Sequence, residues 1–319
     1  MKNQKPEEIV QIKIIGVGGG GTNAVERMLD ANIPMVEYIT INTDEGGYNN
    51  SRAKTKLQIG KKETKGRGAG ADPEKGCRSA EENIKEIEEV LKGCDMIFIT
   101  AGMGGGSGTG AAPIVAEVAR KLGILTVAVV TKPFAFEGKR RMDNALAGIA
   151  KLENHVDSIV IIPNDNLKKI TQTKITLSNA FEMADNVLMQ TVKNLVDLIQ
   201  KTAYINCDFS DIRSVIENSG IMHTATGWSS GIDRGKKILE QITSSMLLES
   251  TVDAADRILL CITATENAGL DEIDEIASAL TTMASPDASI IYSMNFDETM
   301  DDKMKVVLIA TKRKNKMPS

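Results

Sequence analysis

The sequence has 319 residues, a formal net charge of −5, four cysteines and two histidines. A chain of this length is long for one hydrophobic core, so two domains are expected. The acidic balance argues against a nucleic-acid partner, and the scattered cysteines show no metal-ligand spacing. No apolar run approaches the roughly 20 residues of a membrane span, and the N-terminus carries no signal peptide. The composition therefore predicts a reduced, cytoplasmic, soluble protein without a zinc site.

The first predicted strand, Val10–Ile15, leads directly into the glycine-rich segment Gly16–Val25 and a helix to Asp30. Three of these glycines match the dinucleotide fingerprint G-x-G-x-x-G. Asp44 also stands roughly where a ribose-reading acid could sit. The match alone fits a dinucleotide and a mononucleotide equally, because both place phosphate at a helix N-terminus. An NAD(P)-dependent oxidoreductase is therefore an open alternative at this point.

Two further strands are predicted at Tyr38–Asn42 and Thr55–Ile59, the second of them short and edge-like. A second glycine-rich loop, Gly66–Pro73, follows them. Pro73 suits the first turn of a helix because its fixed φ is already helical. We expect that helix to run to about Lys92, with one face solvated by its many Glu and Lys residues.

The most informative stretch is Thr100–Pro113, which reads T-A-G-M-G-G-G-S-G-T-G-A-A-P. The buried-strand pattern Asp95–Ile99 precedes it, and the helical spacing of Ile114–Arg120 follows. Glycines at such a junction let successive backbone N–H groups surround an anion, and the serine and threonine add hydroxyl donors. No lysine follows, as a P-loop would require. The pattern predicts a phosphate cradle without the P-loop lysine; the flanking periodicity disfavours a flexible linker.

Strands at Leu125–Val130 and Ser158–Ile162 continue a strand–helix alternation that specifies a doubly wound parallel sheet of the α/β class. Ligands in such sheets bind beyond the carboxyl ends of the strands. Those ends carry Gly18–Gly21, Asp44, Gly68–Gly70, Gly104–Gly110, Thr131–Glu137 and Asn164. One nucleotide could touch all of them.

A long helix is predicted from Thr176 to Gln200, apolar around most of its circumference and therefore buried between two domains. Near its start Phe181 and Asp185 share a face, four residues apart. The ring could stack on a base, and the carboxylate could accept hydrogen bonds from N1–H and N2–H₂ of guanine. A core ring beside a surface acid is the alternative.

An acidic cluster, Asn206, Asp208 and Asp211, follows that helix. Two carboxylates at a helix start can simply be capping. The remaining predicted elements form a smaller α+β domain without a ligand loop of its own: helices Arg234–Leu248 and Leu270–Ala284, and strands Arg257–Thr263, Ser289–Met294 and Lys305–Ala310.

Taken together, these motifs resemble the FtsZ family of bacterial tubulin-like cell-division GTPases over about residues 10–311. The matching segments are G-G-G-G-T-N-A-V, N-T-D, G-A-G-A-D-P, G-G-G-S-G-T-G, V-T-K-P-F-x-F-E-G-K-R-R, I-P-N-D and N-x-D-F-x-D. The resemblance implies a GTP-binding domain at 10–172, an interdomain helix at 173–203 and a C-terminal α+β domain at 204–311, followed by a basic tail at 312–319. It also implies a protein that assembles head-to-tail with itself into protofilaments.

The resemblance implies a site for GTP or GDP, with Mg²⁺ to offset phosphate charge and no protein residue assigned as a metal ligand. Gly19, Gly20, Gly21, Asn23 and Gly70 would line the phosphate and ribose region. The phosphates would be held by Gly104, Gly105, Gly106, Ser107, Gly108, Thr109 and Gly110. The ribose would be held by Thr131, Pro133, Glu137 and Arg141, and guanine would be read by Asn164, Phe181 and Asp185. Asn206, Asp208 and Asp211 would complete the hydrolytic site of the neighbouring subunit.

The sequence also departs from the family pattern. Lys201–Tyr204 replaces a Pro-Gly ahead of the acidic loop, Glu45–Gly47 replaces a stretch that usually has glutamine, and His223–Trp228 replaces a more apolar one. The chain stops at Ser319, so the family's C-terminal adaptor-docking peptide has no counterpart and membrane adaptors are doubtful partners. A truncated sequence and a divergent or second FtsZ copy, which could pair with another FtsZ, both stay open. A nucleotide-binding filament protein with little or no hydrolysis is the closer alternative function.

Overall fold

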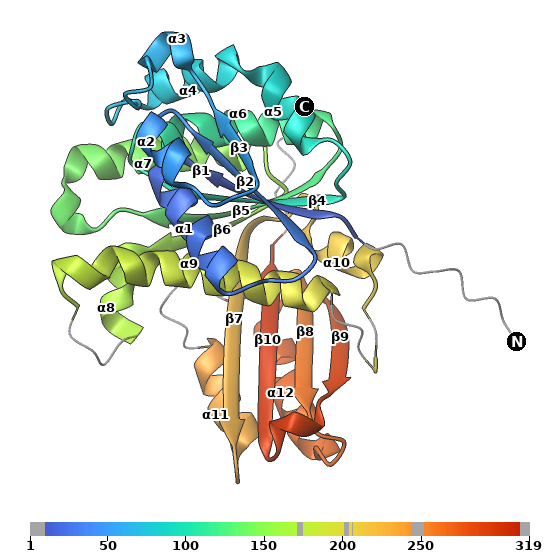
Figure 1. Ribbon diagram of the computed structural model, residues 1–319. Helices are drawn as coiled ribbons and strands as arrows, with labels where there is room; N and C mark the ends of the chain where they lie inside the picture. The colour runs from blue at the N-terminus through green and yellow to red at the C-terminus, as the bar shows by residue number, and fades with distance from the viewer. Residues whose placement is uncertain (1–9, 171–174, 201–203, 206, 244–251, 313–319) are drawn as a thin grey trace, which may run out of the picture.

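The computed structural model describes residues 10–170, 175–200, 204–205, 207–243 and 252–312. These residues form a ten-stranded sheet in the order β3-β2-β1-β4-β5-β6-β7-β10-β8-β9 (Figure 1). The strands are β1 Ile12–Val17, β2 Val36–Asn42, β3 Thr55–Gln58, β4 Met96–Gly102, β5 Leu125–Lys132, β6 Ser158–Pro163, β7 Gly220–Ser230, β8 Arg257–Ala264, β9 Ser289–Phe296 and β10 Lys303–Thr311. The predicted α/β class is confirmed.

The first six strands are all parallel, as predicted. Their side chains alternate between two hydrophobic cores, because successive residues of a strand point to opposite faces. Ile15 and Ile97 face one core, with helices α5 Ile84–Leu91, α6 Ser107–Lys121 and α7 Lys139–Glu153. Ile14 and Phe98 face the other, with α1 Gly18–Asp30, α9 Leu177–Gln200 and α10 Phe209–Ile216. Helices therefore cover both faces of this part of the sheet (Figure 1).

The last four strands form the lower part of the molecule in Figure 1. β7 joins the parallel strands only at its start, where Gly220 and Ile221 pair with the first two residues of β6. β10 runs antiparallel to β7 and β8, and β8 and β9 are parallel. Helices α11 Arg234–Thr243 and α12 Leu270–Met283 contribute to a third hydrophobic core on these strands. The domain boundaries at residues 172 and 203 stay predictions.

Several predicted elements differ from those observed. The helix from Pro73 is two helices, α4 Pro73–Glu82 and α5, which break at Asn83 because its side chain accepts a hydrogen bond from the N–H of Gly60 at 2.8 Å. The helix after the cradle begins at Ser107, not near Ile114, so half of the glycine segment is helical. Strand β7 was not predicted. The end of the predicted helix Arg234–Leu248 lies outside the described residues after Thr243.

The long helix α9 lies between the two groups of strands in Figure 1, but it is not buried all round as predicted. Leu188, Val192 and Val196 are buried, whereas Phe181 is 44% exposed. The exposed side of its first turns faces the carboxyl edge of the parallel strands, where the site described below lies. Among the described residues no helix is long and apolar enough to cross a membrane.

The remaining helices are short: α2 Glu45–Asn50, α3 Lys61–Thr64 and α8 Leu167–Ile170, with 3₁₀ turns at Ala135–Glu137, Asn164–Asn166 and Glu298–Met300. Two of these turns follow β5 and β6 at the carboxyl edge of the sheet. They therefore shape the region where the predicted ligand loops converge.

Candidate nucleotide-binding site

Two helices begin side by side at the carboxyl edge of the sheet. Neither α1 nor α6 has a side-chain cap, and neither carries an acidic residue in its first turn. A Cβ built on Gly18, whose φ is +70°, would lie 2.6 Å from the backbone nitrogen of Gly108, so the two helix starts abut. Uncapped helix N-termini leave backbone N–H groups without intrahelical partners and carry a partial positive charge. The pair therefore forms an anion site.

The glycines around these helix starts serve two different purposes. A Cβ built on Gly19, Gly70 or Gly105 would meet nothing within 4 Å, so these backbones are open to a ligand. At Gly106 the added atom would lie 2.7 Å from the Cβ of Ala69, and at Gly108 2.9 Å from the carbonyl oxygen of Gly102. These last glycines allow α6 to approach its neighbours closely, a packing role that was not predicted from the sequence.

Hydroxyl groups hold the cradle loop in shape. The N–H of Gly104 donates to Oγ1 of the buried Thr109 at 2.8 Å. Ser107, the first residue of α6, shares a 2.5 Å hydrogen bond with Thr43 Oγ1. Thr43 was not among the predicted site residues, although its position directly after a strand at this edge was an available signal. Thr109 thus organises the loop, and the hydroxyls of Ser107 and Thr43 lie together at the start of α6.

Asp44, which the dinucleotide alternative assigned to a ribose, has a structural role. Its carboxylate caps α2 by accepting a hydrogen bond from the N–H of Gly47 at 2.7 Å. The N–H of Asp44 donates in turn to Asn42 Oδ1 at 3.2 Å. A carboxylate already engaged as a helix cap explains this residue without a cofactor.

The predicted ribose segment packs beside the cradle loop. Glu137 accepts a hydrogen bond from the N–H of Phe134 at 2.8 Å and pairs with Arg141 at 3.1 Å. Its side chain is only 6% exposed, whereas that of Arg141 is 49% exposed. A Cβ on Gly104 would lie 2.6 Å from the carbonyl oxygen of Arg141. Thr131 and Pro133 are buried in the same segment. The structure therefore brings the predicted phosphate and ribose residues together.

Aromatic rings gather where the predicted base site lies. Phe134 stacks on Phe136 with ring centroids 5.2 Å apart and meets Phe181 edge-on at 5.6 Å. Asn164 is 4% exposed, and its Oδ1 has no hydrogen-bond partner among the described residues. A buried polar atom without a partner is costly, and a ligand bound beside Asn164 would supply the missing bond.

The carboxylate of Asp185 occupies an unusual environment. Burial raises its pKa to about 7, against the opposing effect of Arg27 on α1. Arg27 in turn pairs with Glu182, one turn before Asp185 on α9, at 3.4 Å. Asn23 lies on the same helix as Arg27, one turn earlier, and is exposed. Asp185, predicted to read the base, therefore lies on the side of α9 that faces α1.

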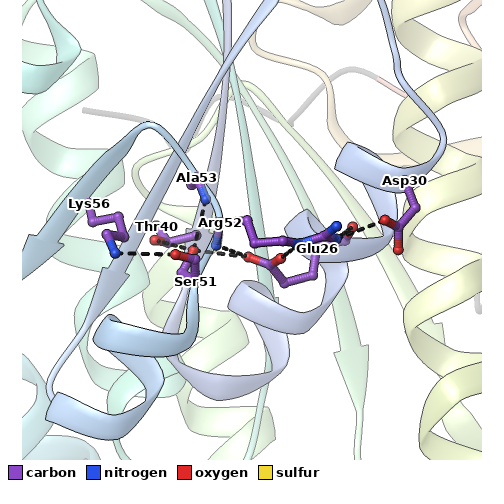
Figure 2. Close-up of polar contacts among 7 residues, drawn as sticks. All are labelled: Glu26, Asp30, Thr40, Ser51, Arg52, Ala53 and Lys56. Atoms are coloured by element: carbon purple, nitrogen blue, oxygen red, sulfur yellow. Dashed lines mark hydrogen bonds and ion pairs between the residues drawn. The ribbon is translucent and has the colours of Figure 1, made fainter.

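Helix α1 is held in place by the polar network that Figure 2 shows. Glu26 accepts hydrogen bonds from the hydroxyl of Ser51 at 3.0 Å and from the N–H of Arg52 at 2.8 Å. The Arg52 guanidinium also pairs with Glu26 and Asp30, and Thr40 of β2 donates to Ser51. The network joins α1 to the connection between α2 and β3. The sequence showed no local signal for it, because its members are far apart along the chain.

The predicted acidic cluster lies at the other end of the sheet. Asp208 accepts a hydrogen bond from the N–H of Asp211 at 2.8 Å, and Asp211 accepts one from the N–H of Asp208 at 3.1 Å. The two residues therefore cap α10, as the alternative interpretation expected. Asn206 lies outside the described residues.

Helix α10 ends against the amino end of β6, where the carbonyl oxygen of Ile216 accepts a hydrogen bond from Ser158 Oγ at 2.7 Å. Asn164 follows the opposite end of that strand, about 20 Å away at ~3.3 Å per residue. In Figure 1, α10 lies at the right and α8, which follows Asn164 closely, at the left. The structure does not bring Asp208 and Asp211 to the cradle of their own chain.

Comparisons with known proteins agree with this architecture. Residues 11–172 match the GTPase domain of the tubulin/FtsZ family, and residues 220–314 match the FtsZ family C-terminal domain. The chain is 47% identical over 302 residues to the cell division protein FtsZ of Coxiella burnetii, covering 94% of this chain and 78% of that protein.

Solved structures show the same fold. An empty FtsZ dimer of M. jannaschii superimposes with a TM-score of 0.87 at 37% identity, covering 98% of this chain and 96% of that one. A GTPγS-bound CetZ2 protofilament of Haloferax volcanii is alike in fold alone, with a TM-score of 0.80 at 17% identity over 96% of this chain and 95% of that one. Family, sequence and fold comparisons agree: this chain belongs to the FtsZ family of cell-division proteins, with a tubulin-like GTPase domain.

Proposed function

We propose that this protein binds GTP at the carboxyl edge of its parallel strands, polymerises head-to-tail in the cytoplasm at the division site, and hydrolyses GTP at the junctions between subunits. The observation that carries the proposal is the pair of abutting, uncapped helix starts of α1 and α6. Phosphate oxygens supply the acceptors that these N–H groups lack. Mg²⁺ on the phosphates would offset their charge, and no side chain is assigned to hold it.

Guanine recognition follows from the groups at the other end of the site. The amide of Asn164 and the carboxylate of Asp185 would bind the base edge, and the exposed ring of Phe181 would lie against its face. An ionised carboxylate accepts from both N1–H and N2–H₂ of guanine, whereas adenine offers no such pair of donors. A bound guanine would also give Asn164 Oδ1 a hydrogen-bond partner.

The acids for hydrolysis come from the neighbouring subunit in this proposal. The first turns of α1 and α6 contain no acidic residue, and α10 lies at the opposite edge of the sheet. Head-to-tail packing would place the amino edge of one subunit on the carboxyl edge of the next. Each of Asp208 and Asp211 uses one carboxylate oxygen in the capping box, so the second oxygens can position the attacking water.

The first experiment replaces each acid by asparagine and not by alanine. Asparagine caps a helix about as well as aspartate, so α10 keeps its start while the charge is lost. We expect Asp208→Asn and Asp211→Asn to bind GTP with near-normal affinity, to release phosphate on the order of 10²-fold more slowly, and to form longer-lived filaments. Phosphate release and light scattering measure both effects.

The second experiment mixes two inactive variants. Gly105→Asp is the suitable cradle variant, because its Cβ meets nothing within 4 Å, whereas a side chain at Gly106 would strike Ala69. Mixing Gly105→Asp with Asp211→Asn creates junctions in which an intact cradle meets an intact Asp211, so part of the activity should return. Turnover per subunit that stays constant below the concentration at which scattering appears would rule out the shared site. Assembly with GTP but without phosphate release would favour a filament protein that does not hydrolyse.

A further inference from the structure

Strand β9 is the last strand in the order of the sheet and therefore forms one of its two edges (Figure 1). On its outer side, the part of the chain that the structure describes pairs with it at a single point, where Ile205 and Met294 exchange two backbone hydrogen bonds of 3.1 and 3.2 Å. The ring of Tyr204 also packs against Phe296, with ring centroids 4.8 Å apart. The second half of β9 is therefore covered, whereas its first half, residues 289–292, has no neighbouring outer strand among these residues.

The backbone groups of β9 point alternately toward β8 and outward, because successive residues of a strand direct their N–H and C=O groups to opposite sides. The N–H groups of Ser289 and Asp297 donate to carbonyl oxygens beside the two ends of β8, each at 2.9 Å. Met294 instead uses its N–H and C=O on the outer side. Odd-numbered residues therefore face β8 and even-numbered residues face outward. In the first half of the strand, Ile290 and Tyr292 thus direct their backbone N–H and C=O groups away from the sheet.

β9 lacks the residues that usually keep an edge strand from pairing with another chain. It reads S-I-I-Y-S-M-N-F, with no charged residue and no proline. Natural edge strands are often short or carry lysine or proline, because a bare row of N–H and C=O groups is a template for a further strand. Strand β3 at the opposite edge has these features, since it has four residues and includes Lys56. The two edges of the sheet therefore differ, and the edge of β9 is the one suited to an added strand.

The first half of β9 begins in an acidic part of the surface. Residues 252–302 contain twelve acidic residues and one basic residue, Arg257, whose guanidinium donates to two backbone carbonyl oxygens at the end of α10. Asp287 is exposed two residues before the strand, and the backbone of Asp256 bonds to its first residue. A second copy of β9 would bring further acids to this surface, so like charges oppose pairing between two copies. A segment with basic residues would be attracted to it.

We propose that the outer edge of β9 at residues 289–292 binds an extended peptide of a partner protein as an added strand, with basic residues of the peptide against the acids beside the strand. The outward N–H and C=O groups of Ile290 and Tyr292 supply the backbone hydrogen bonds, which give most of the affinity in this mode of recognition. Tyr292, which is 39% exposed, also offers apolar surface to a neighbouring side chain of the peptide.

The first test is amide hydrogen exchange, followed residue by residue in the nucleotide-free protein at a concentration without light scattering. The N–H groups of Ile290 and Tyr292 should exchange about tenfold or more faster than those of Ile291 and Ser293, since only the latter face β8. Equal protection of all four would show that the edge is already covered and would overturn the proposal. Protection that rises with protein concentration would assign the edge to a second copy and would overturn it as well.

The second test adds a fluorescent synthetic peptide of sequence K-K-V-T-V-T-V-K-K at low salt. It should bind and protect the N–H groups of Ile290 and Tyr292 from exchange. A peptide with glutamate in place of lysine, and one with its central amides N-methylated, should each bind about tenfold more weakly or not at all. If the lysine peptide does not bind, or if the glutamate peptide binds equally well, the proposed partner chemistry is wrong.

The third test compares Tyr292→Pro with its control, Tyr292→Thr. Proline removes an N–H that faces outward, so the hydrogen bonds to β8 remain, whereas threonine keeps the N–H and suits a strand. The lysine peptide should bind Tyr292→Thr about as well as wild type and Tyr292→Pro about tenfold more weakly. Equal binding to both folded variants would place the peptide elsewhere and overturn the proposal. If Tyr292→Pro does not fold, the N-methylated peptide on the wild-type protein decides the same question.

Discussion

Helices α1 and α6 differ from α10 in how they begin. At the carboxyl edge, α1 and α6 begin without a side-chain cap. At the amino edge, α10 begins with a reciprocal cap made by Asp208 and Asp211. The first N–H groups of α1 and α6 need a hydrogen-bond acceptor from outside the helix, whereas α10 has its capping acceptors within its own chain. The difference shows where a ligand belongs, and it shows that acids near a helix start are not by themselves evidence of a nucleotide site.

The same difference has an energetic consequence. A missing cap costs about 1 kcal/mol at each helix, so the cradle is less stable alone than with phosphate bound. A ligand that binds only the folded state then stabilises it in proportion to the logarithm of its concentration. Variants that place a side chain at the uncapped start of α6, or that remove the cap of α10, test this contrast directly.

The largest effect is expected from Gly105→Asp, which places an anion at the open helix starts. Because a Cβ at this position meets nothing within 4 Å, the nucleotide-free fold should be retained. Repulsion between the new carboxylate and phosphate should weaken GTP binding on the order of 10²-fold. Gly105→Asn, which has the same size without the charge, is the control in a nucleotide titration. Equal losses in the two variants would show that bulk, and not charge, blocks the site.

A smaller effect is expected from Asn164→Leu. The buried Oδ1 of Asn164 has no partner among the described residues, so an apolar side chain of similar size should keep or raise the stability of the nucleotide-free protein. GTP affinity should fall roughly tenfold, as one hydrogen bond to guanine is lost. Thermal unfolding and a binding titration on the same sample separate the two effects. A destabilised nucleotide-free protein would contradict a role in ligand binding alone.

The smallest effect is expected at the capped start of α10. Asp208→Ala removes the acceptor of the Asp211 N–H and should cost about 1 kcal/mol, whereas Asp208→Asn should cost little. The melting temperature without nucleotide should therefore be about 2–4 °C lower in the alanine variant only. Equal melting temperatures for both variants would show that the capping box contributes no stability, and the contrast with α1 and α6 would lose its energetic basis.

Most residues of the proposed phosphate and ribose site follow buried strands, so their gathering at one edge was predictable. A parallel strand that is covered on both faces reads as a continuous apolar run, as β5 does, and residues after such runs must meet at one edge of the sheet. Thr43 also follows a buried strand, so its place at this edge could have been predicted in the same way. The break between α4 and α5 at Asn83 could not be predicted, because it depends on a hydrogen bond to Gly60, which is distant in sequence.

Local pattern thus decided the strand–helix alternation and the placement of the glycine segment at a strand–helix junction, since each depends on neighbours along the chain. Tertiary packing decided which glycines are open and which allow close contact, because that depends on Ala69 and Gly102 across the fold. It also decided that Arg27 pairs with Glu182, since α1 and α9 meet only in three dimensions. The same packing places the last residue of α10 at the amino end of β6, opposite the end that Asn164 follows, an arrangement that sequence spacing does not encode.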